Sequence, residues 1–116
     1  MPWNGSPGHG WAGAEPWLPW SPEPETRNVA ALAARESSIL HLYRRLLAAR
    51  RASAALHDGD LVLLDAPEGV VAWERRAGDD VRRVAVNFSD RAVLVSFADG
   101  WSVEVSSSPD GGDEGE

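Results

Sequence analysis

The chain has 116 residues, 43% of them hydrophobic, which is enough for one domain with a modest core and too many for a wholly disordered chain. Its formal net charge of −7 argues against a nucleic-acid or anionic-membrane partner. The absence of cysteine excludes disulfides and thiol catalysis. No apolar run approaches the roughly 20 residues that span a bilayer, and no secretory signal pattern opens the chain. The missing signal pattern favours a cytoplasmic location, while the absence of cysteine leaves the redox compartment undetermined.

Residues 1–35 predict an irregular but ordered segment. The first 24 residues hold six of the eight prolines and four of the six tryptophans. Prolines at this density exclude a continuous helix or a central strand, and the interspersed glycines supply turns. Tryptophan is rare in disordered segments, so its abundance here indicates an ordered loop. Asn28 is placed to cap a short helical turn over residues 29–34.

Residues 36–57 contain the only long periodic stretch. Apolar side chains recur at the i, i+3, i+4, i+7, i+8 spacing of an amphipathic helix: Ile39, Leu42, Tyr43, Leu46 and Leu47. Residues 57–59 then predict the exit turn, with Gly59 near the C-terminal stop. No strand precedes this helix, so we expect its apolar face to need a partner outside the chain. By itself the chain is therefore expected to be marginally stable or to self-associate.

From residue 60 the hydrophobic period changes from helical to two. Strands are predicted over residues 61–65, 70–76, 81–88, 92–97 and 101–105, joined by tight turns rich in Gly and Asp. This pattern predicts an antiparallel β-domain over residues 58–106, built as a small sandwich or open barrel. Residues 107–116 predict a disordered acidic tail. Helices followed by an antiparallel sheet make the expected fold class α+β.

Several linked motifs occur along the chain in a fixed order. They are Met1-Pro2-Trp3, Glu15-Pro16-Trp17-Leu18-Pro19, Asn28-Val29, Ser38-Ile39-Leu40 with Tyr43-Arg44-Arg45-Leu46, Arg50-Arg51-Ala52-Ser53-Ala54-Ala55-Leu56, and Val84-Ala85-Val86-Asn87-Phe88. Together they resemble the C-terminal part of α-glucosidases, the oligo-1,6-glucosidase-like members of the α-amylase family of glycoside hydrolases (family 13). The resemblance implies that residues 1–57 form the last loop and helix of a (β/α)8 barrel and that a C-terminal β-domain follows. One departure is Arg35-Glu36, where the family usually has Asp-Pro, so Ser37 or Ser38 is left to cap the helix.

The resemblance also implies a reaction. Retaining α-glucosidases use two carboxyl groups about 5–5.5 Å apart across the glycosidic bond. In the family these groups lie on barrel strands, and these 116 residues contain none of those strands, so we assign no catalytic residue and expect the chain by itself to be inactive. The chain's own acids, including Asp79 and Asp80 at a hairpin end, are expected to be solvated. No residue spacing predicts a cofactor or metal site.

Tryptophans supply the candidate sugar-binding residues. The barrel loop of the relatives lies at the face where active sites are built, so Trp3, Asn4 and Trp11 are candidates to border the substrate cleft. The plainer interpretation, which we favour, is that the loop tryptophans pack onto the barrel. Trp73 and Trp101 could form a sugar-binding platform on the β-domain, although core packing is again the favoured interpretation.

The partner implied by the resemblance is an α-glucoside or oligosaccharide, bound through the parent barrel. Two alternatives remain open. The chain could be a non-catalytic glucan-binding module, or an interaction protein whose helix docks onto a separate barrel-bearing chain. The sequence leaves the choice between α-1,4 and α-1,6 bonds, and between hydrolysis and glucosyl transfer, undetermined.

Overall fold

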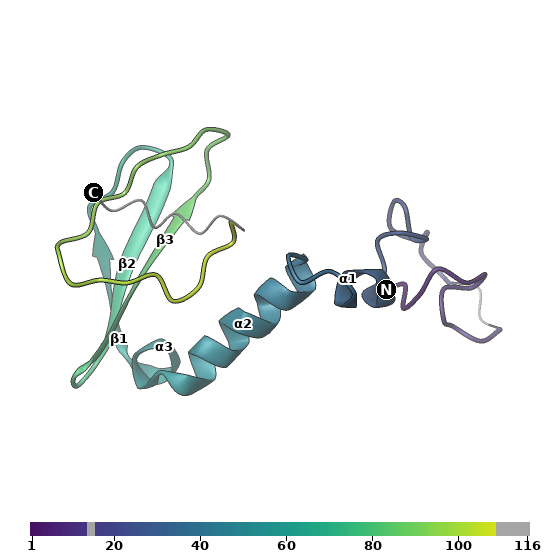
Figure 1. Cartoon of the computed structure of the whole chain (residues 1–116), viewed down its shortest axis with the longest axis horizontal. Coiled ribbons are helices and arrows are strands. Elements are labelled where there is room, and N and C mark those ends of the chain that lie inside the picture. Colours follow the sequence, from purple (N-terminus) through teal and green to yellow (C-terminus); the bar gives the residue numbers. More distant parts are fainter. Residues whose placement is uncertain (14–15, 109–116) are drawn as a thin grey trace. The chain divides into compact units, whose positions relative to one another are not determined.

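The computed structural model describes residues 1–13 and 16–108. Its elements follow one another as α1 (Val29–Ala33), α2 (Ile39–Ala52), α3 (Ala54–Asp58), β1 (Asp60–Leu64), β2 (Val70–Ala77) and β3 (Asp80–Asn87), as Figure 1 shows. Three helices and an antiparallel sheet of three strands confirm the α+β fold class. The predicted acidic tail falls outside the described residues from residue 109 onward.

The structure divides into two compact units. One comprises residues 1–45 with residues 106–108, and the other comprises residues 46–105. The division falls inside α2, whereas the domain boundaries expected from the sequence lie at residues 35, 57 and 106; those boundaries stay a prediction. Within the described ranges, no helix has the length and apolarity needed to cross a membrane.

The first unit is organised around α1. Asn28 caps this helix, because its side-chain oxygen accepts a hydrogen bond from the Ala31 N–H at 2.9 Å. The Asn28 amide also donates to the carbonyls of Pro24 (3.1 Å) and Glu25 (2.7 Å), which fixes the turn that enters the helix. The cap predicted at Asn28 is thus confirmed, with α1 ending at Ala33.

α2 begins at Ile39, three residues later than the sequence predicts. The Ser38 hydroxyl, expected as a possible cap, instead donates to the Leu32 carbonyl at 2.6 Å. It therefore satisfies a carbonyl at the C-terminal end of α1, while the Ser38 carbonyl accepts the first helical bond of α2 from Leu42 N–H at 3.0 Å. Residues 35–36 offer neither an N-cap side chain nor a proline that would start the helix there. α2 therefore begins directly after Ser38, whose side chain is bonded to α1.

In the second unit the predicted helix is broken near its end. Ser53 leaves the helical conformation (φ −110°, ψ 120°) and caps α3, accepting from the Leu56 N–H. Gly59 then ends α3, as the sequence predicts, and its position is sterically tight. A Cβ at residue 59 would lie 2.5 Å from the Ala55 carbonyl oxygen and 2.7 Å from that of Arg76. Only glycine lets the chain pass from α3 into the sheet at this point.

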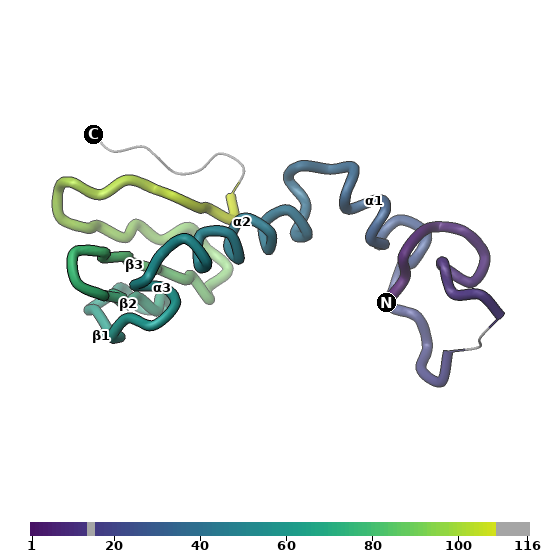
Figure 2. The backbone as a smooth tube through the Cα atoms, turned by 90° about the horizontal axis from the view of Figure 1, so that it is seen from below, coloured from purple at the N-terminus to yellow at the C-terminus, as the bar shows by residue number. Residues whose placement is uncertain are grey.

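The sheet is a meander in the order β1-β2-β3, antiparallel throughout. Leu63 pairs with Trp73, and Trp73 with Val84, so the register continues across all three strands. α3 packs against β2 and β3, and Figure 2 traces the backbone through these elements. In this unit, Ala55 of α3 and Ala72 of β2 are the only aliphatic or aromatic residues that are buried within the described parts of the chain.

Two of the five predicted strands are wrong. Residues 92–97 and 101–105 form no strand, and among the described residues no backbone hydrogen bond joins them to a neighbouring segment. The period-two pattern is nevertheless present in the burial, since Val93, Val95 and Phe97 are half-buried between exposed neighbours. The alternation of apolar and polar residues decides which side chains face the core. A strand also needs a neighbouring strand whose backbone groups form hydrogen bonds with its own. The described residues accordingly form one open sheet, and the expected sandwich or barrel is not present in them.

Candidate functional site

The N-terminal loop closes on itself through tryptophan. The Trp3 N–H donates to the His9 carbonyl at 2.9 Å, and the Trp11 N–H donates to the Gly8 carbonyl at 2.9 Å. The Trp11 indole Nε1–H donates to the Met1 carbonyl, also at 2.9 Å. These bonds satisfy backbone groups that no helix or strand serves, so residues 1–11 form an ordered loop, as the tryptophan content predicts.

The closure depends on a glycine. Gly10 has a φ of +86°, and a Cβ there would lie 2.9 Å from the Cβ of Trp3 and 3.3 Å from Nδ2 of Asn4. A side chain at residue 10 would therefore both strain the backbone and displace Trp3 and Asn4. Gly10 is a structural residue that determines where two of the predicted site residues lie.

The loop is attached to the start of α1. The N–H groups of Val29 and Ala30 donate to the carbonyls of Pro2 (3.2 Å) and Trp3 (2.9 Å). First-turn N–H groups of a helix have no partner within the helix, so the loop backbone takes the place of that partner. Pro2 is buried against this junction. The position of Trp3 is consequently fixed by α1.

Trp3, Asn4 and Trp11, the residues predicted to border a sugar cleft, all lie in this closed loop. Both tryptophans are about half exposed, and Trp11 has 48% of its surface accessible. Asn4 is held in place, because its side-chain oxygen accepts from the Ser6 N–H at 3.0 Å and the Ser6 hydroxyl at 2.6 Å. The structure thus brings the three residues into one ordered segment, while their role stays a prediction.

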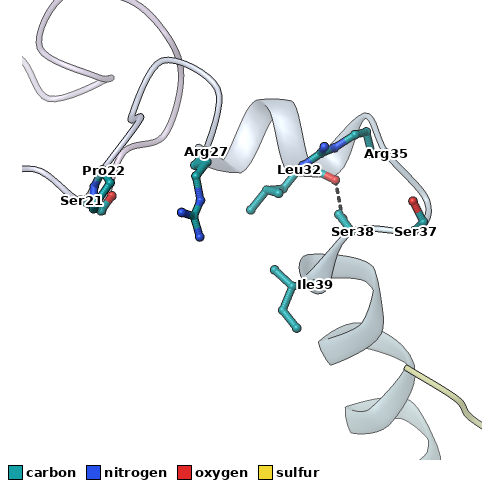
Figure 3. Close-up of a pocket in the computed structure, with 8 residues that line it drawn as sticks. All are labelled: Ser21, Pro22, Arg27, Leu32, Arg35, Ser37, Ser38 and Ile39. Carbon is teal, nitrogen blue, oxygen red and sulfur yellow. Dashed lines mark hydrogen bonds between the residues drawn. The ribbon is translucent and has the colours of Figure 1, made fainter. Parts of the chain in front are cut away.

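Two shallow hollows lie in the first unit. The larger, about 500 Å³, is lined by Ser21, Pro22, Arg27, Leu32, Arg35, Ser37, Ser38 and Ile39. In Figure 3 the side chains of Arg27, Leu32 and Ile39 extend toward the same space, and the dashed line marks the bond between Ser38 and Leu32. The smaller hollow, about 280 Å³, is lined by Met1, Pro2 and residues 16–21, including Trp17 and Trp20. Trp17 has 91% of its surface accessible. Within the described residues it therefore does not show the packing that the sequence led us to expect for the loop tryptophans.

The two tryptophans of the second unit have different surroundings, and their role as a sugar platform stays a prediction. The Arg83 guanidinium lies 4.3 Å from the centre of the Trp101 ring and 5.6 Å from that of Phe97. Arg83 Nε also donates to Glu74 Oε2 at 3.0 Å, and Arg76 donates to the other oxygen of Glu74 at 2.8 Å. These two arginines lower the pKa of the Glu74 carboxyl below its usual value. Trp101 is therefore part of a cation–π cluster, and Trp73 is half-buried in the sheet.

No family model matches the chain. Its sequence is, however, similar to part of several α-glucosidases. The chain is 35% identical over 92 residues to a probable α-glucosidase of Rhizobium meliloti, and 34% identical over 92 residues to a glucan 1,6-α-glucosidase of Streptococcus dysgalactiae. These matches cover 79% and 78% of this chain, respectively. An oligo-1,6-glucosidase of Parageobacillus thermoglucosidasius is 29% identical over 101 residues.

Solved structures agree with the sequence matches. The fold superposes on an α-glucosyl transfer enzyme with a TM-score of 0.74 and 30% identity, over 88% of this chain and 19% of the enzyme. A trehalulose synthase mutant gives a TM-score of 0.68 with 28% identity, over 76% of this chain and 16% of that protein.

This chain is homologous to part of the α-glucosidases of glycoside hydrolase family 13. It spans about 17% of the length of the curated relatives that it matches. The resemblance drawn from the motifs is thereby confirmed.

The acids of this α-glucosidase homologue do not all lie where the sequence predicts. Asp79 and Asp99 are exposed, as expected of solvated acids. The prediction that Asp80 is solvated is wrong. Its Oδ2 accepts hydrogen bonds from the Ser53 hydroxyl at 2.6 Å and from the Ala55 N–H at 2.9 Å. The hydrogen bond from Ser53 is the largest cause of the lowered pKa of Asp80, followed by the bond from Ala55. Residue spacing cannot reveal this contact, because Ser53 and Ala55 lie 27 and 25 residues before Asp80 in the chain.

Within residues 1–13 and 16–108, no group of three or more His, Asp or Glu side chains could hold a metal ion. His41, expected at the surface, has its Nε2 3.0 Å from the Ala33 carbonyl and so contacts the end of α1. His57 lies 2.8 Å from its exposed neighbour Asp58. Both histidines make local structural contacts.

Proposed function

We propose that this chain is the C-terminal portion of an α-glucosidase-like glycoside hydrolase that acts on α-glucosides. In this proposal the N-terminal loop and α2 complete a (β/α)8 barrel, and the sheet belongs to a C-terminal β-domain. The observation that carries it is the agreement of two independent comparisons: 35% identity to a probable α-glucosidase, and a TM-score of 0.74 to an α-glucosyl transfer enzyme.

The exposed face of α2 supports this assignment. Ile39, Tyr43, Leu46 and Leu47 are all exposed, and Tyr43 has 61% of its surface accessible. Burying one such side chain contributes roughly 1.5–3 kcal/mol, so a helix with this face gains stability by packing against a larger body. A barrel would provide that body. The expectation that the helix needs a partner therefore agrees with the proposed position of α2.

In the same proposal Trp3, Asn4 and Trp11 border the sugar cleft of the complete enzyme. Indole rings stack on the apolar faces of pyranose rings, and an exposed ring held by hydrogen bonds is suited to this contact. The Met1 and Gly8 carbonyls hold Trp11 in this way. Catalysis in α-glucosidases needs two carboxyl groups at opposed sides of the glycosidic bond. We propose that the 116-residue chain by itself contributes the loop and does not cleave the substrate.

A chimera tests the assignment. The matching 92-residue segment of the Rhizobium meliloti probable α-glucosidase would be replaced by the corresponding segment of this chain, and hydrolysis of maltose and isomaltose would be measured. We expect a folded chimera that retains hydrolysis, and a loss of activity when Trp3 or Trp11 is changed to alanine. A folded chimera without activity on any α-glucoside would contradict the assignment, and unchanged activity in both alanine variants would remove the tryptophans from the cleft.

One observation favours a second function, that of a glucan-binding module. Trp17 is almost fully exposed next to a hollow that Trp20 also lines. Titration of the full chain with maltose or isomaltose, followed by tryptophan fluorescence, separates the two functions. A saturable change that disappears in Trp17→Ala supports a binding module, and no change supports a structural role within the enzyme.

A further inference from the structure

The N-terminal loop contains an asparagine that is followed by glycine. The chain has three asparagines, Asn4, Asn28 and Asn87, and no glutamine, so these residues carry all of its side-chain amides. Only Asn4 precedes a glycine. Such a pair is chemically reactive, because glycine has no Cβ to keep its backbone nitrogen away from the preceding side chain. That nitrogen can attack Cγ of the asparagine and displace its amide as ammonia.

The fold requires glycine at residue 5 and leaves its nitrogen unengaged. A Cβ on Gly5 would lie 2.9 Å from the backbone oxygen of Glu25, so a larger residue would displace the loop. Gly5 is exposed to solvent, and within residues 1–13 and 16–108 its N–H has no hydrogen-bond acceptor. The attacking nitrogen is therefore not held by a competing bond, and water reaches it.

Ser6 directs the Asn4 side chain toward this nitrogen. Asn4 Oδ1 accepts from the Ser6 N–H at 3.0 Å and from the Ser6 hydroxyl at 2.6 Å. A side-chain oxygen that reaches the second amide along the chain places the side chain over the first amide, which is that of Gly5. The two donors also stabilise the negative charge that develops on Oδ1 when a nitrogen adds to Cγ. Ser6 thus orients and polarises the group that reacts.

Asn87 has the same hydrogen bonds but lacks the other requirements. Its Oδ1 accepts from the Ser89 N–H at 2.9 Å and from the Ser89 hydroxyl at 2.7 Å. The next residue, however, is Phe88, whose side chain obstructs the approach. The Phe88 N–H also donates to the Gly69 carbonyl at 2.8 Å, so this nitrogen is engaged in the second unit.

Asn28 is protected by burial. Its side chain is 3% exposed, and its amide donates to the carbonyls of Pro24 and Glu25. The N–H of the following residue, Val29, donates to the Pro2 carbonyl at 3.2 Å. Within the described parts of the chain, Asn4 is therefore the asparagine that combines a following glycine, an unengaged nitrogen and a polarised side-chain oxygen.

We propose that Asn4 is a self-modification site, at which the side-chain amide is lost without an enzyme. The Gly5 nitrogen gives its proton to solvent and forms a bond to Asn4 Cγ. The bond from Cγ to Nδ2 then breaks, and the amide leaves as ammonia with a proton from water. A water molecule opens the resulting cyclic succinimide at either carbonyl, which gives aspartate or isoaspartate at residue 4. The net reaction consumes one water, releases one ammonia and adds a negative charge to the loop.

The loop accommodates the aspartate product. Among the described residues, Nδ2 of Asn4 has no hydrogen-bond acceptor, so its replacement by oxygen breaks no bond there. The Ser6 donors then bind a carboxylate, and hydrogen bonds to an ionised acceptor are stronger than those to a neutral one. Isoaspartate instead adds a methylene group to the backbone directly after Trp3. All of these contacts lie within the first unit, and the inference does not rest on the proposed enzymatic role.

The first test follows the native chain over time. The full chain would be incubated for several weeks at neutral pH and sampled by peptide mapping that separates aspartyl from isoaspartyl peptides. We expect both products at residue 4, formed about tenfold or more faster than at Asn28 or Asn87. If Asn4 stays intact in the native chain but converts in denaturant, the fold protects the residue and the proposal is overturned. Faster conversion at either of the other two asparagines overturns it as well.

The variant Ser6→Ala measures what the fold contributes. Ser6 is exposed, and among the described residues its hydroxyl bonds to Asn4 alone, so the variant should fold as the parent chain does. We expect conversion of Asn4 in the native chain to slow about fivefold, with equal rates for variant and parent in denaturant. Ser37→Ala, at another exposed serine, is the control and should convert as the parent chain does. An unchanged native rate in Ser6→Ala overturns the role of Ser6.

The variant Phe88→Gly separates sequence from structure. It gives Asn87 the same two following residue types as Asn4, and Phe88 is 75% exposed, so little packing is lost. The N–H of residue 88 retains its acceptor, the Gly69 carbonyl. We therefore expect Asn87 to convert more slowly than Asn4 in the native chain and equally fast in denaturant. Equal rates in the native chain would show that sequence alone sets the reactivity, which overturns the part assigned to the fold.

Discussion

The Ser53 hydroxyl donates a 2.6 Å hydrogen bond to the carboxylate of Asp80, which lies 27 residues further along the chain. The same Asp80 oxygen accepts the Ala55 N–H at 2.9 Å, a first-turn donor of α3 that has no partner within the helix. Ser53 in turn caps α3 by accepting from the Leu56 N–H. The two side chains together fasten α3 to the start of β3, so a contact between distant residues determines where the helix is broken.

Removal of the Ser53 hydroxyl should loosen this junction. Ser53 is buried, and Ser53→Ala deletes the N-cap of α3 and one partner of Asp80, so we expect a loss of roughly 1–2 kcal/mol in the free energy of unfolding. Urea denaturation followed by NMR signals of β2 would measure it. Ser102→Ala, at an exposed position, is the control and should leave stability unchanged. Equal stability of both variants would show that the bond contributes nothing.

The second unit should lose stability in acid. The pKa values of Asp80 and Glu74 are lowered in the folded chain, so the unfolded chain binds more protons than the folded chain as the pH falls. The contribution is complete at neutral pH and decreases as the pH falls below about 4.5 toward the lowered values. Denaturation midpoints of the second unit measured from neutral pH downward should show this decrease, and Asp80→Asn should make it shallower. A slope unchanged by Asp80→Asn would contradict the assignment.

Gly59 should tolerate no side chain. In Gly59→Ala the added methyl group meets the backbone oxygens of Ala55 and Arg76, which cannot move without shifting α3 or β2. We expect the free energy of unfolding to fall by about 1–3 kcal/mol, the usual cost of overpacking. Thermal denaturation followed by circular dichroism would measure the loss, with Asp79→Ala in an exposed turn as the control. A Gly59→Ala variant as stable as the parent chain would show that the junction adapts.

Asn28 should control the first unit. Its side chain is 3% exposed and bonds to Ala31, Pro24 and Glu25. Asn28→Ala removes a helix cap and leaves two carbonyls without this donor, so we expect roughly 1–2 kcal/mol of local destabilisation. Hydrogen exchange of the Ala30 and Ala31 amides would detect it as lost protection.

Asn28→Asp is the informative comparison for that variant. Aspartate keeps the acceptor for Ala31 and loses both amide donors. If the protection in Asn28→Asp lies between that of Asn28→Ala and that of the parent chain, the acceptor bond from Ala31 and the two amide donor bonds each account for part of the effect. Full protection in Asn28→Ala would mean that the Trp3 and Pro2 carbonyls hold α1 without the cap.

Local features of this protein could be predicted from the sequence alone. The Asn28 cap, the amphipathic stripe of α2, the stop at Gly59 and the first three strands each depend on residues a few positions apart, whose spacing is visible in the chain. The relationship to α-glucosidases was also visible, because several motifs occur in a fixed order. The loop containing Trp3, Asn4 and Trp11 is ordered as its composition indicates.

Only the tertiary structure decided the features that join distant residues. Ser53 breaks the long helix because Asp80 lies beside it, and Arg83 stacks on Trp101 because the chain returns to the sheet after β3. The alternating pattern of residues 92–105 predicted strands, but no neighbour supplies a hydrogen-bond ladder for them in the described residues. A sequence specifies local conformation through short-range propensities. A strand edge, a carboxylate or an apolar face instead finds its partner only when the fold brings another surface next to it.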